Sequence, residues 1–249
     1  MKKLKFGSGE NSFSEESKCY ISNSYTNSFE YLLFVDSRGL VINENNFENT
    51  YMYKIMNFFN NSKISYICIS RPKNLTVYAS LYNFIQLNPS LSFKNLITNL
   101  GFVDCTPKKE SNIKDIEEQI DENIKIRLGR INQEQYMLNN GEQEMLATIS
   151  YNSKYIYKIV NLLNSKFEKL YFINTPKITN DINFERKRPN SFFFQLEKTN
   201  NLIESIIENI NKPVKLINIK SMVSTYDGVH FNKNGHEKIF IKLKEGISK

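Results

Sequence analysis

Short apolar runs recur along the chain, and each is bounded by small or polar residues. Runs of this length that are apolar at consecutive positions are typical of strands buried on both faces of a parallel sheet. The runs lie at residues 31–35, 64–70, 96–103, 169–174 and 214–219.

Between these runs, apolar side chains return every three or four residues, which is the spacing of a helix with one buried face. This spacing is found within 51–59, 155–163 and 202–210, and a last helix rich in Lys and Ile is expected after Asn234. Strands that alternate with helices predict an α/β fold in which helices cover both faces of a parallel sheet.

The remaining segments set the predicted domain organisation. Residues 1–29 are rich in Ser, Asn and Glu, and we expect an irregular N-terminal lead-in. Residues 30–249 are predicted to form a single α/β domain, because 249 residues with 40% hydrophobic content allow one well-buried core. The charged stretch 108–141 interrupts the alternation, and we interpret it as a mostly solvated helical excursion.

Charge and cysteine content narrow the possible partners and compartment. The net charge is +7, but the Lys residues alternate with Glu and Asp, and the compact basic run 186–188 is short, so no nucleic-acid partner is predicted. The three cysteines are far apart, which argues against a disulfide framework or a Cys-based metal site. Without an apolar signal segment or a run of about 18 apolar residues, we expect a cytoplasmic protein with no membrane span.

Imidazole chemistry has one possible location, because both histidines lie within 226–236. In the sequence DGVH, Asp227 stands three residues before His230 and can accept a hydrogen bond from one ring nitrogen on a turn. The alternative is that Asp227 caps a turn and His230 lies on the surface. The position after the last predicted strand favours a site, because open α/β sheets bind ligands at the carboxyl edge. His236 has no matching upstream acid, and we expect an exposed helix residue there.

A hydroxyl partner for this imidazole is found at the end of the first predicted strand. Ser37 directly follows the apolar run in FVDSRG, at a strand-to-helix turn whose first N–H groups can stabilise an oxyanion. Serine needs a base within hydrogen-bond reach to act as a nucleophile. In the alternative interpretation, Asp36 and Ser37 only cap the next helix.

Three short motifs together resemble the SGNH (GDSL-like) hydrolases. They are VDSRG at 35–39, GFVDCTP at 101–107, which is similar to a GxVDCxP variant from bacterial surface-glycan clusters, and DGVHFNKNG at 227–235. The resemblance implies a three-layer α/β/α fold with a flavodoxin-like parallel sheet of about five strands. It also implies hydrolysis or transfer of an ester, such as an O-acetylated sugar or glycan, by Ser37, Asp227 and His230 without a metal or organic cofactor.

The chain departs from this family at the oxyanion hole. Val35 replaces the usual glycine before the Asp-Ser pair, Val103 stands where an asparagine would donate, and no glycine occurs at 70–72. Cys105 is an alternative nucleophile, although a small residue that fills space at a strand end is favoured. The positions assigned to oxyanion or supporting roles are Arg38, Arg71, Gly101 and Asp104.

The sequence therefore favours a serine esterase or acyl hydrolase and leaves three alternatives. An O-acyltransferase would use the same three residues with a sugar hydroxyl as acceptor. A degenerate SGNH fold would bind a glycan or protein without turnover, because fold alone does not establish function. Nucleic-acid binding is the least supported. Substrate identity and oligomeric state are not determined by these patterns.

Overall fold

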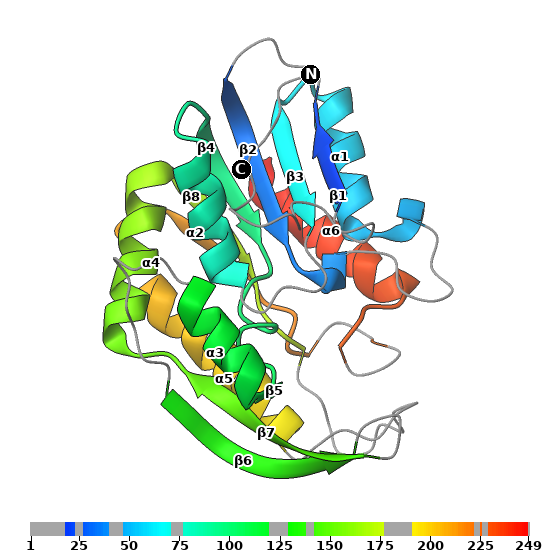
Figure 1. Ribbon diagram of the computed structural model, residues 1–249. Helices are drawn as coiled ribbons and strands as arrows, with labels where there is room; N and C mark the ends of the chain where they lie inside the picture. The colour runs from blue at the N-terminus through cyan, green and yellow to red at the C-terminus, as the bar shows by residue number, and fades with distance from the viewer. Residues whose placement is uncertain are drawn as a thin grey trace.

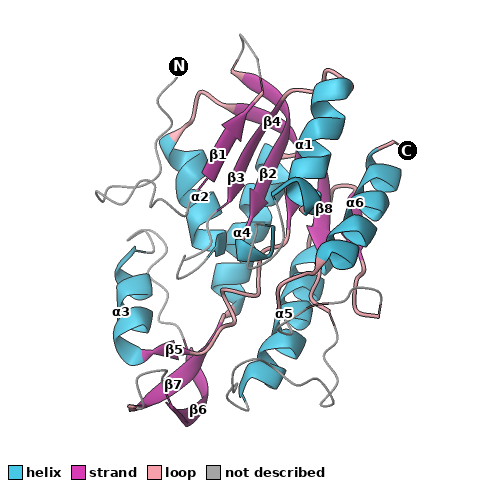
Figure 2. Ribbon diagram, turned by 90° about the vertical axis from the view of Figure 1, so that its right-hand side faces the viewer, coloured by secondary structure: helices cyan, strands magenta, loops and turns pink. Residues whose placement is uncertain are grey.

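The computed structural model of the chain is shown in Figures 1 and 2. It describes residues 18–22, 27–39, 47–70, 77–119, 129–137, 142–176, 191–221, 225 and 229–248.

A six-stranded sheet with the order β1-β3-β2-β4-β8-β9 forms the centre of the molecule. Its neighbours pair in parallel, except that β1 runs antiparallel to β3 at one edge. Without β1, the order of the five parallel strands is that of a flavodoxin-like sheet, so the predicted fold class is confirmed. The strands are β1 (Lys18–Ile21), β2 (Ser28–Val35), β3 (Tyr66–Ser70), β4 (Ser92–Thr98), β8 (Lys169–Ile173) and β9 (Val214–Ile217).

Helices cover both faces of this sheet (Figures 1 and 2). Successive side chains of a strand point to opposite faces, so Leu32 and Phe34 enter one hydrophobic core while Leu33 and Val35 enter the other. Among the described helices, none combines the length and the hydropathy needed to cross a lipid bilayer. One face carries α1 (Tyr51–Asn61) and α6 (Lys233–Ile247), and the other carries α2 (Val77–Leu87), α4 (Ser153–Lys166) and α5 (Ser191–Glu208).

The strand order places a topological switch point beside β2. From β2 the chain moves to β3 on one side, and it later adds β4 on the other side. Loops that leave neighbouring strands in opposite directions open a crevice at the carboxyl edge, where α/β folds bind ligands. Two short 3₁₀ helices, η1 (Ser37–Gly39) and η2 (Phe47–Asn49), follow β2 at this edge.

Two predicted segments differ in the structure. The irregular lead-in predicted over 1–29 is wrong for Lys18–Ile21, which pairs with β3; four residues are too few to show a strand pattern. The strand predicted at 96–103 is instead β4, Ser92–Thr98, because Gly101 with φ of +112° begins a turn. Beyond Thr98, Leu100 and Phe102 are buried in that turn and Val103 is partly buried.

Within the helical excursion predicted at 108–141, the described residues form one helix, Glu110–Gln119, with a strand on either side of it. These two strands and a third, Gln143–Ser150, which follows the excursion, form a second, antiparallel sheet in the order β5-β7-β6, which lies beyond the carboxyl edge of the large sheet (Figure 1). Arg130 ties the helix to this sheet through ion pairs with Glu110 (2.8 Å) and Glu117 (2.7 Å), so much of the charge pattern reflects local pairing. The elements are β5 (Lys108–Lys109), α3 (Glu110–Gln119), β6 (Gly129–Met137) and β7 (Gln143–Ser150).

His236 docks the start of α6 against the start of α1. The prediction of an exposed residue is wrong, since His236 is 1% exposed. Its Nδ1 accepts the Tyr51 backbone N–H at 3.2 Å, and its ring packs on Tyr51 and Phe231. The first N–H groups of a helix have no partner within the helix, so this contact satisfies one of them and allows the imidazole to be buried.

Burial of His236 predicts a defined loss of stability in acid. Burial, together with Lys54 and His230 nearby, lowers the pKa of His236 to about 4. The neutral ring is favoured in the folded state, so its contribution is present above pH about 6.5 and is lost as the pH falls towards 4; the shift corresponds to about 3 kcal/mol. Urea unfolding between pH 7 and 4 should show that His236→Asn, which retains an acceptor near the Nδ1 position, loses less stability than wild type. Parallel curves would contradict this account.

Substitution by alanine should change the stability of the fold differently at two glycines. At Gly101, φ is +112° and an added Cβ would lie 3.1 Å from Thr199 Cγ2, so Gly101→Ala should destabilise the fold by about 1–3 kcal/mol. Near the end of α6, a Cβ on Gly246 would make an ordinary 3.4 Å contact with Lys215, and alanine is the better helix former. Gly246→Ala should therefore be neutral or stabilising in thermal unfolding. Equal effects of the two changes would refute the assignment of strain to Gly101.

Candidate active site

Ser37 and His230 meet at the carboxyl edge of the large sheet. The Ser37 hydroxyl oxygen lies 3.3 Å from His230 Nε2, although the two residues are 193 positions apart. Ser37 begins η1 directly after β2, and His230 lies between β9 and α6. Both side chains are partly exposed, as a group that meets a substrate must be. The sequence predicts this approach, and the structure brings the two groups together.

The loop that carries His230 is held on both sides. Thr225 and Phe231 form an antiparallel bridge that closes the chain around it. Immediately afterwards, Asn232 caps α6 by accepting the Gly235 N–H at 2.9 Å. Asp227, the acid expected to orient the imidazole, lies outside the described residues, as does Arg71. Their assignments remain predictions.

Asp36 is a fully buried carboxylate, and its own turn satisfies it. Its oxygens accept from the Arg38 backbone N–H at 2.9 Å, from Arg38 Nε at 3.0 and 3.1 Å, and from Nη2 at 2.9 Å. A buried charge is tolerated when it is paired and hydrogen-bonded in this way. The alternative that these residues only cap the next helix therefore holds for Asp36, whose carboxylate accepts the Arg38 N–H. It does not hold for Ser37, whose hydroxyl is directed at His230.

Asn99 is a member of the site that the sequence analysis missed. It follows the last residue of β4, and its Oδ1 accepts the Asp36 backbone N–H at 2.8 Å. Its Nδ2 donates to Asp36 Oδ1 at 3.0 Å and to the Tyr51 hydroxyl at 2.9 Å. Asn99 thus joins the loops after β2 and β4 across the switch point. An earlier end for the predicted strand, marked by this Asn and by Gly101, would have revealed it.

Arg38 supports the turn from within. The side chain is 1% exposed, its Nη2 donates to the Asn99 carbonyl, and its guanidinium lies 5.1 Å from the centre of the Phe102 ring. Its Nη1 is buried and has no hydrogen-bond partner among the described residues. These contacts make Arg38 the counter-ion of Asp36, and its oxyanion or supporting role in the site stays a prediction.

Gly101 and Asp104 belong to the turn after β4. Asp104 is fully buried, and its Oδ1 accepts the Tyr78 N–H at 3.3 Å, in the first turn of α2, where a carboxylate is stabilising. Lys108 donates to the carbonyls of residues 103, 104 and 106, and burial lowers the pKa of its ammonium to about 8. We infer that Gly101 and Asp104 have structural roles in this turn.

Cys105 has the properties of a packing residue. It is 2% exposed, and burial, with the nearby Asp104 carboxylate, raises the pKa of its thiol to about 12. The thiolate is the nucleophilic form of cysteine. A thiol that stays protonated at neutral pH favours the space-filling interpretation over the nucleophilic one.

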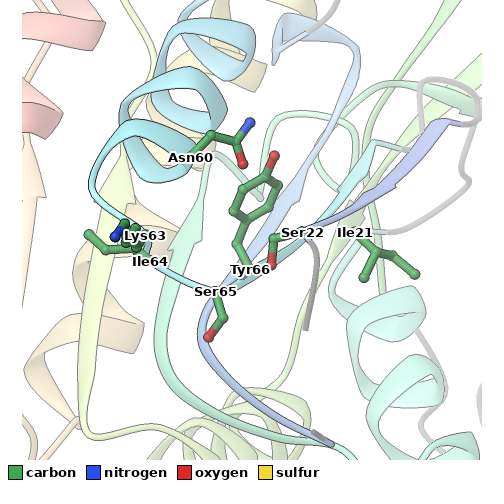
Figure 3. A pocket seen from close by; sticks show the side chains of 7 residues that line it. All are labelled: Ile21, Ser22, Asn60, Lys63, Ile64, Ser65 and Tyr66. Carbon is green, nitrogen blue, oxygen red and sulfur yellow. Dashed lines mark hydrogen bonds between the residues drawn. The ribbon is translucent and has the colours of Figure 1, made fainter. Parts of the chain in front are cut away.

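A cavity of about 490 Å³ lies at the other end of the sheet. Figure 3 shows its side chains, which come from the end of β1, the end of α1 and the start of β3. This edge carries the amino ends of the parallel strands, so the cavity is separate from Ser37 and His230. Its lining consists of Ile21, Ser22, Asn60, Lys63, Ile64, Ser65 and Tyr66.

Comparison with known proteins gives similarity in backbone course only. No protein-family model matches the sequence, and no curated protein matches it. The solved structure of a carbohydrate acetylesterase from Sinorhizobium meliloti has 11% sequence identity to this chain and superposes with a TM-score of 0.48. The match covers 88% of this chain and 98% of the acetylesterase chain. The aryl esterase of M. smegmatis is 12% identical with a TM-score of 0.47, over the same shares of the two chains. The function of this chain has to be argued from its own side chains.

Proposed function

We propose that the protein is a serine esterase or acyl hydrolase of the SGNH kind, with Ser37 as nucleophile and His230 as general base. The observation that carries the proposal is the 3.3 Å approach of the Ser37 hydroxyl to His230 Nε2. A nucleophile and a base within hydrogen-bond reach, at the carboxyl edge of an α/β sheet, are the parts that acyl transfer needs.

The proposed reaction has two halves that use the same imidazole. His230 takes the Ser37 proton as the serine oxygen bonds to the ester carbonyl carbon, and the protonated ring then gives that proton to the departing alcohol. In the second half, His230 takes a proton from water, the resulting hydroxide attacks the acyl-serine, and the carboxylic acid leaves as Ser37 is reprotonated. Asp227 is assigned the role of holding the other ring nitrogen.

Several donors near Ser37 that could bind the oxyanion are already engaged among the described residues. In η1, the Arg38 N–H is bound to the Asp36 carboxylate and the Gly39 N–H to the Asp36 carbonyl. We therefore assign the oxyanion to the Ser37 N–H, the first of the 3₁₀ turn. Both hydrogens of the Asn99 side-chain amide are engaged, and the Val103 side chain has no donor. Since one missing donor lowers the rate about a hundredfold or more, we expect a slow enzyme.

Because the Arg38 and Gly39 N–H groups and the Asn99 amide are already hydrogen-bonded, an oxyanion would have few donors. This observation favours a second candidate function, a glycan-binding protein of the same fold that does not turn over its ligand. For the enzyme, an O-acetylated sugar or glycan is the proposed substrate class, and it comes from the resemblance of the three sequence motifs. No metal or organic cofactor is needed for either half-reaction.

Labelling with a fluorophosphonate probe distinguishes the two candidates. Wild type should be labelled on Ser37, Ser37→Ala should not be labelled at all, and His230→Ala should be labelled about 10²- to 10⁴-fold more slowly, because the base is lost. Hydrolysis of p-nitrophenyl acetate should fall in parallel.

Ser165→Ala is the matched control, since the Ser165 hydroxyl lies on α4 and, among the described residues, donates to the Leu162 carbonyl alone. This variant should be labelled like wild type. Folded wild type that neither reacts with the probe nor hydrolyses acetyl esters would eliminate the esterase and leave the binding protein.

A further inference from the structure

Tyr51 lies between the two halves of the candidate site. It is the first residue of α1, and its side chain is 1% exposed. Its hydroxyl lies close to Gly39 in the turn that carries Ser37. A Cβ added to Gly39 would lie 3.2 Å from the Tyr51 hydroxyl oxygen and 2.7 Å from Val35 Cγ2. The absence of a side chain at Gly39 is therefore what lets Tyr51 approach this turn.

On the nucleophile side, the contact runs through Asn99. The Tyr51 hydroxyl accepts one hydrogen of Asn99 Nδ2 at 2.9 Å, and the other hydrogen goes to Asp36 at 3.0 Å. With Asn99 Oδ1 bound to the Asp36 N–H, this amide has every hydrogen-bonding atom engaged and a fixed orientation. Asp36 is the residue directly before Ser37.

On the base side, the contacts run through Phe231 and His236. The Tyr51 ring packs against the Phe231 ring, with centroids 6.3 Å apart, and Phe231 directly follows His230. The Tyr51 backbone N–H donates to His236 Nδ1 at 3.2 Å, and the His236 ring lies edge-on to Phe231 with centroids 5.6 Å apart. Tyr51 therefore contacts Phe231, the neighbour of His230, directly, and is linked to Asp36, the neighbour of Ser37, through Asn99.

We propose that Tyr51 is a positioning residue that sets the register of the His230 loop against the Ser37 turn. The inference rests on the proposed function, because register matters to a reaction between these two groups. The hydroxyl orients Asn99 and through it Asp36, while the ring and backbone N–H locate Phe231 and His236. Tyr51 has no direct part in the chemistry. Misplacement of reacting groups by a fraction of an ångström is enough to lower a rate substantially.

Tyr51→Phe tests the hydroxyl with the ring retained. Labelling of Ser37 by the fluorophosphonate should slow about tenfold, since the Asn99 amide loses a partner and the Asp36 turn its restraint. With p-nitrophenyl acetate the loss should appear in kcat with KM unchanged. Tyr78→Phe is the matched control: Tyr78 is also fully buried, but within the part of the chain that the structure describes its hydroxyl has no hydrogen-bond partner. This control should be labelled at the wild-type rate.

Nitrogen NMR of the imidazoles gives a readout that does not depend on activity. The chain has two histidines, so His230→Ala assigns both sets of signals. Ser37→Ala supplies the reference spectrum for His230 without its serine contact. In Tyr51→Phe the His230 signals should move towards that reference, and in Tyr78→Phe they should stay at the wild-type position.

The experiments distinguish failure of the proposed esterase function from failure of the positioning role of Tyr51. Wild type without labelling, but with the His230 signals shifted in Tyr51→Phe, would refute the esterase and retain the positioning role. Wild type with labelling, and Tyr51→Phe with wild-type kinetics and unshifted His230 signals, would overturn the inference and leave the esterase intact.

A second pair of variants covers the case in which Tyr51→Phe does not fold. His236→Asn keeps an acceptor for the Tyr51 N–H, whereas His236→Leu removes it and retains an apolar side chain. The His230 signals should stay near the wild-type position in the first variant and shift in the second. Equal spectra for the two would overturn the inference.

Discussion

The arrangement of the site depends on one buried carboxylate. Asp36 is inaccessible to solvent at the end of β2, where an unpaired charge would be strongly unfavourable. Arg38 supplies the counter-charge from two residues away, and Asn99 supplies an amide from the neighbouring strand. β2 and β4 are neighbours in the sheet, and this pairing joins the loops that follow them at the switch point. Ser37 lies between the two charged residues, so its direction follows from theirs.

The second constraint is the docking of α6 on α1. A neutral imidazole, His236, accepts a hydrogen bond at the start of α1, and the ion pair between Lys54 and Glu237 joins the same two helices at the surface. The His230 loop leads directly into α6, so its position follows from where that helix is held. Two elements far apart in sequence thus reach one edge because each is anchored to a packed partner. Charge pairing anchors one of them, and packing with a backbone hydrogen bond anchors the other.

Much of this could be predicted from the sequence, because a parallel strand covered by helices has to be apolar on consecutive positions. The runs around Leu33 and Tyr171 show that pattern clearly. The candidate chemistry could also be located, since both histidines lie in one segment and Ser37 ends an apolar run. The roles of Asn99 and His236 could not be predicted, because each depends on a hydrogen-bond partner that is distant in the sequence. Asn99 gains its meaning from Asp36, 63 residues away, and His236 from Tyr51, 185 residues away. The antiparallel sheet within 108–150 was hidden by charged side chains that pair locally.

The central claim is that Ser37 forms a covalent bond to the acyl group under the action of His230. Mass spectrometry of the protein, quenched with acid during turnover of an acetyl ester and then digested, tests this claim most directly. The account predicts one acetyl group on the peptide that contains Ser37, and no acetyl group on that peptide in His230→Ala quenched at the same time. Hydrolysis of the ester by wild type with the acetyl group on a different residue would contradict it.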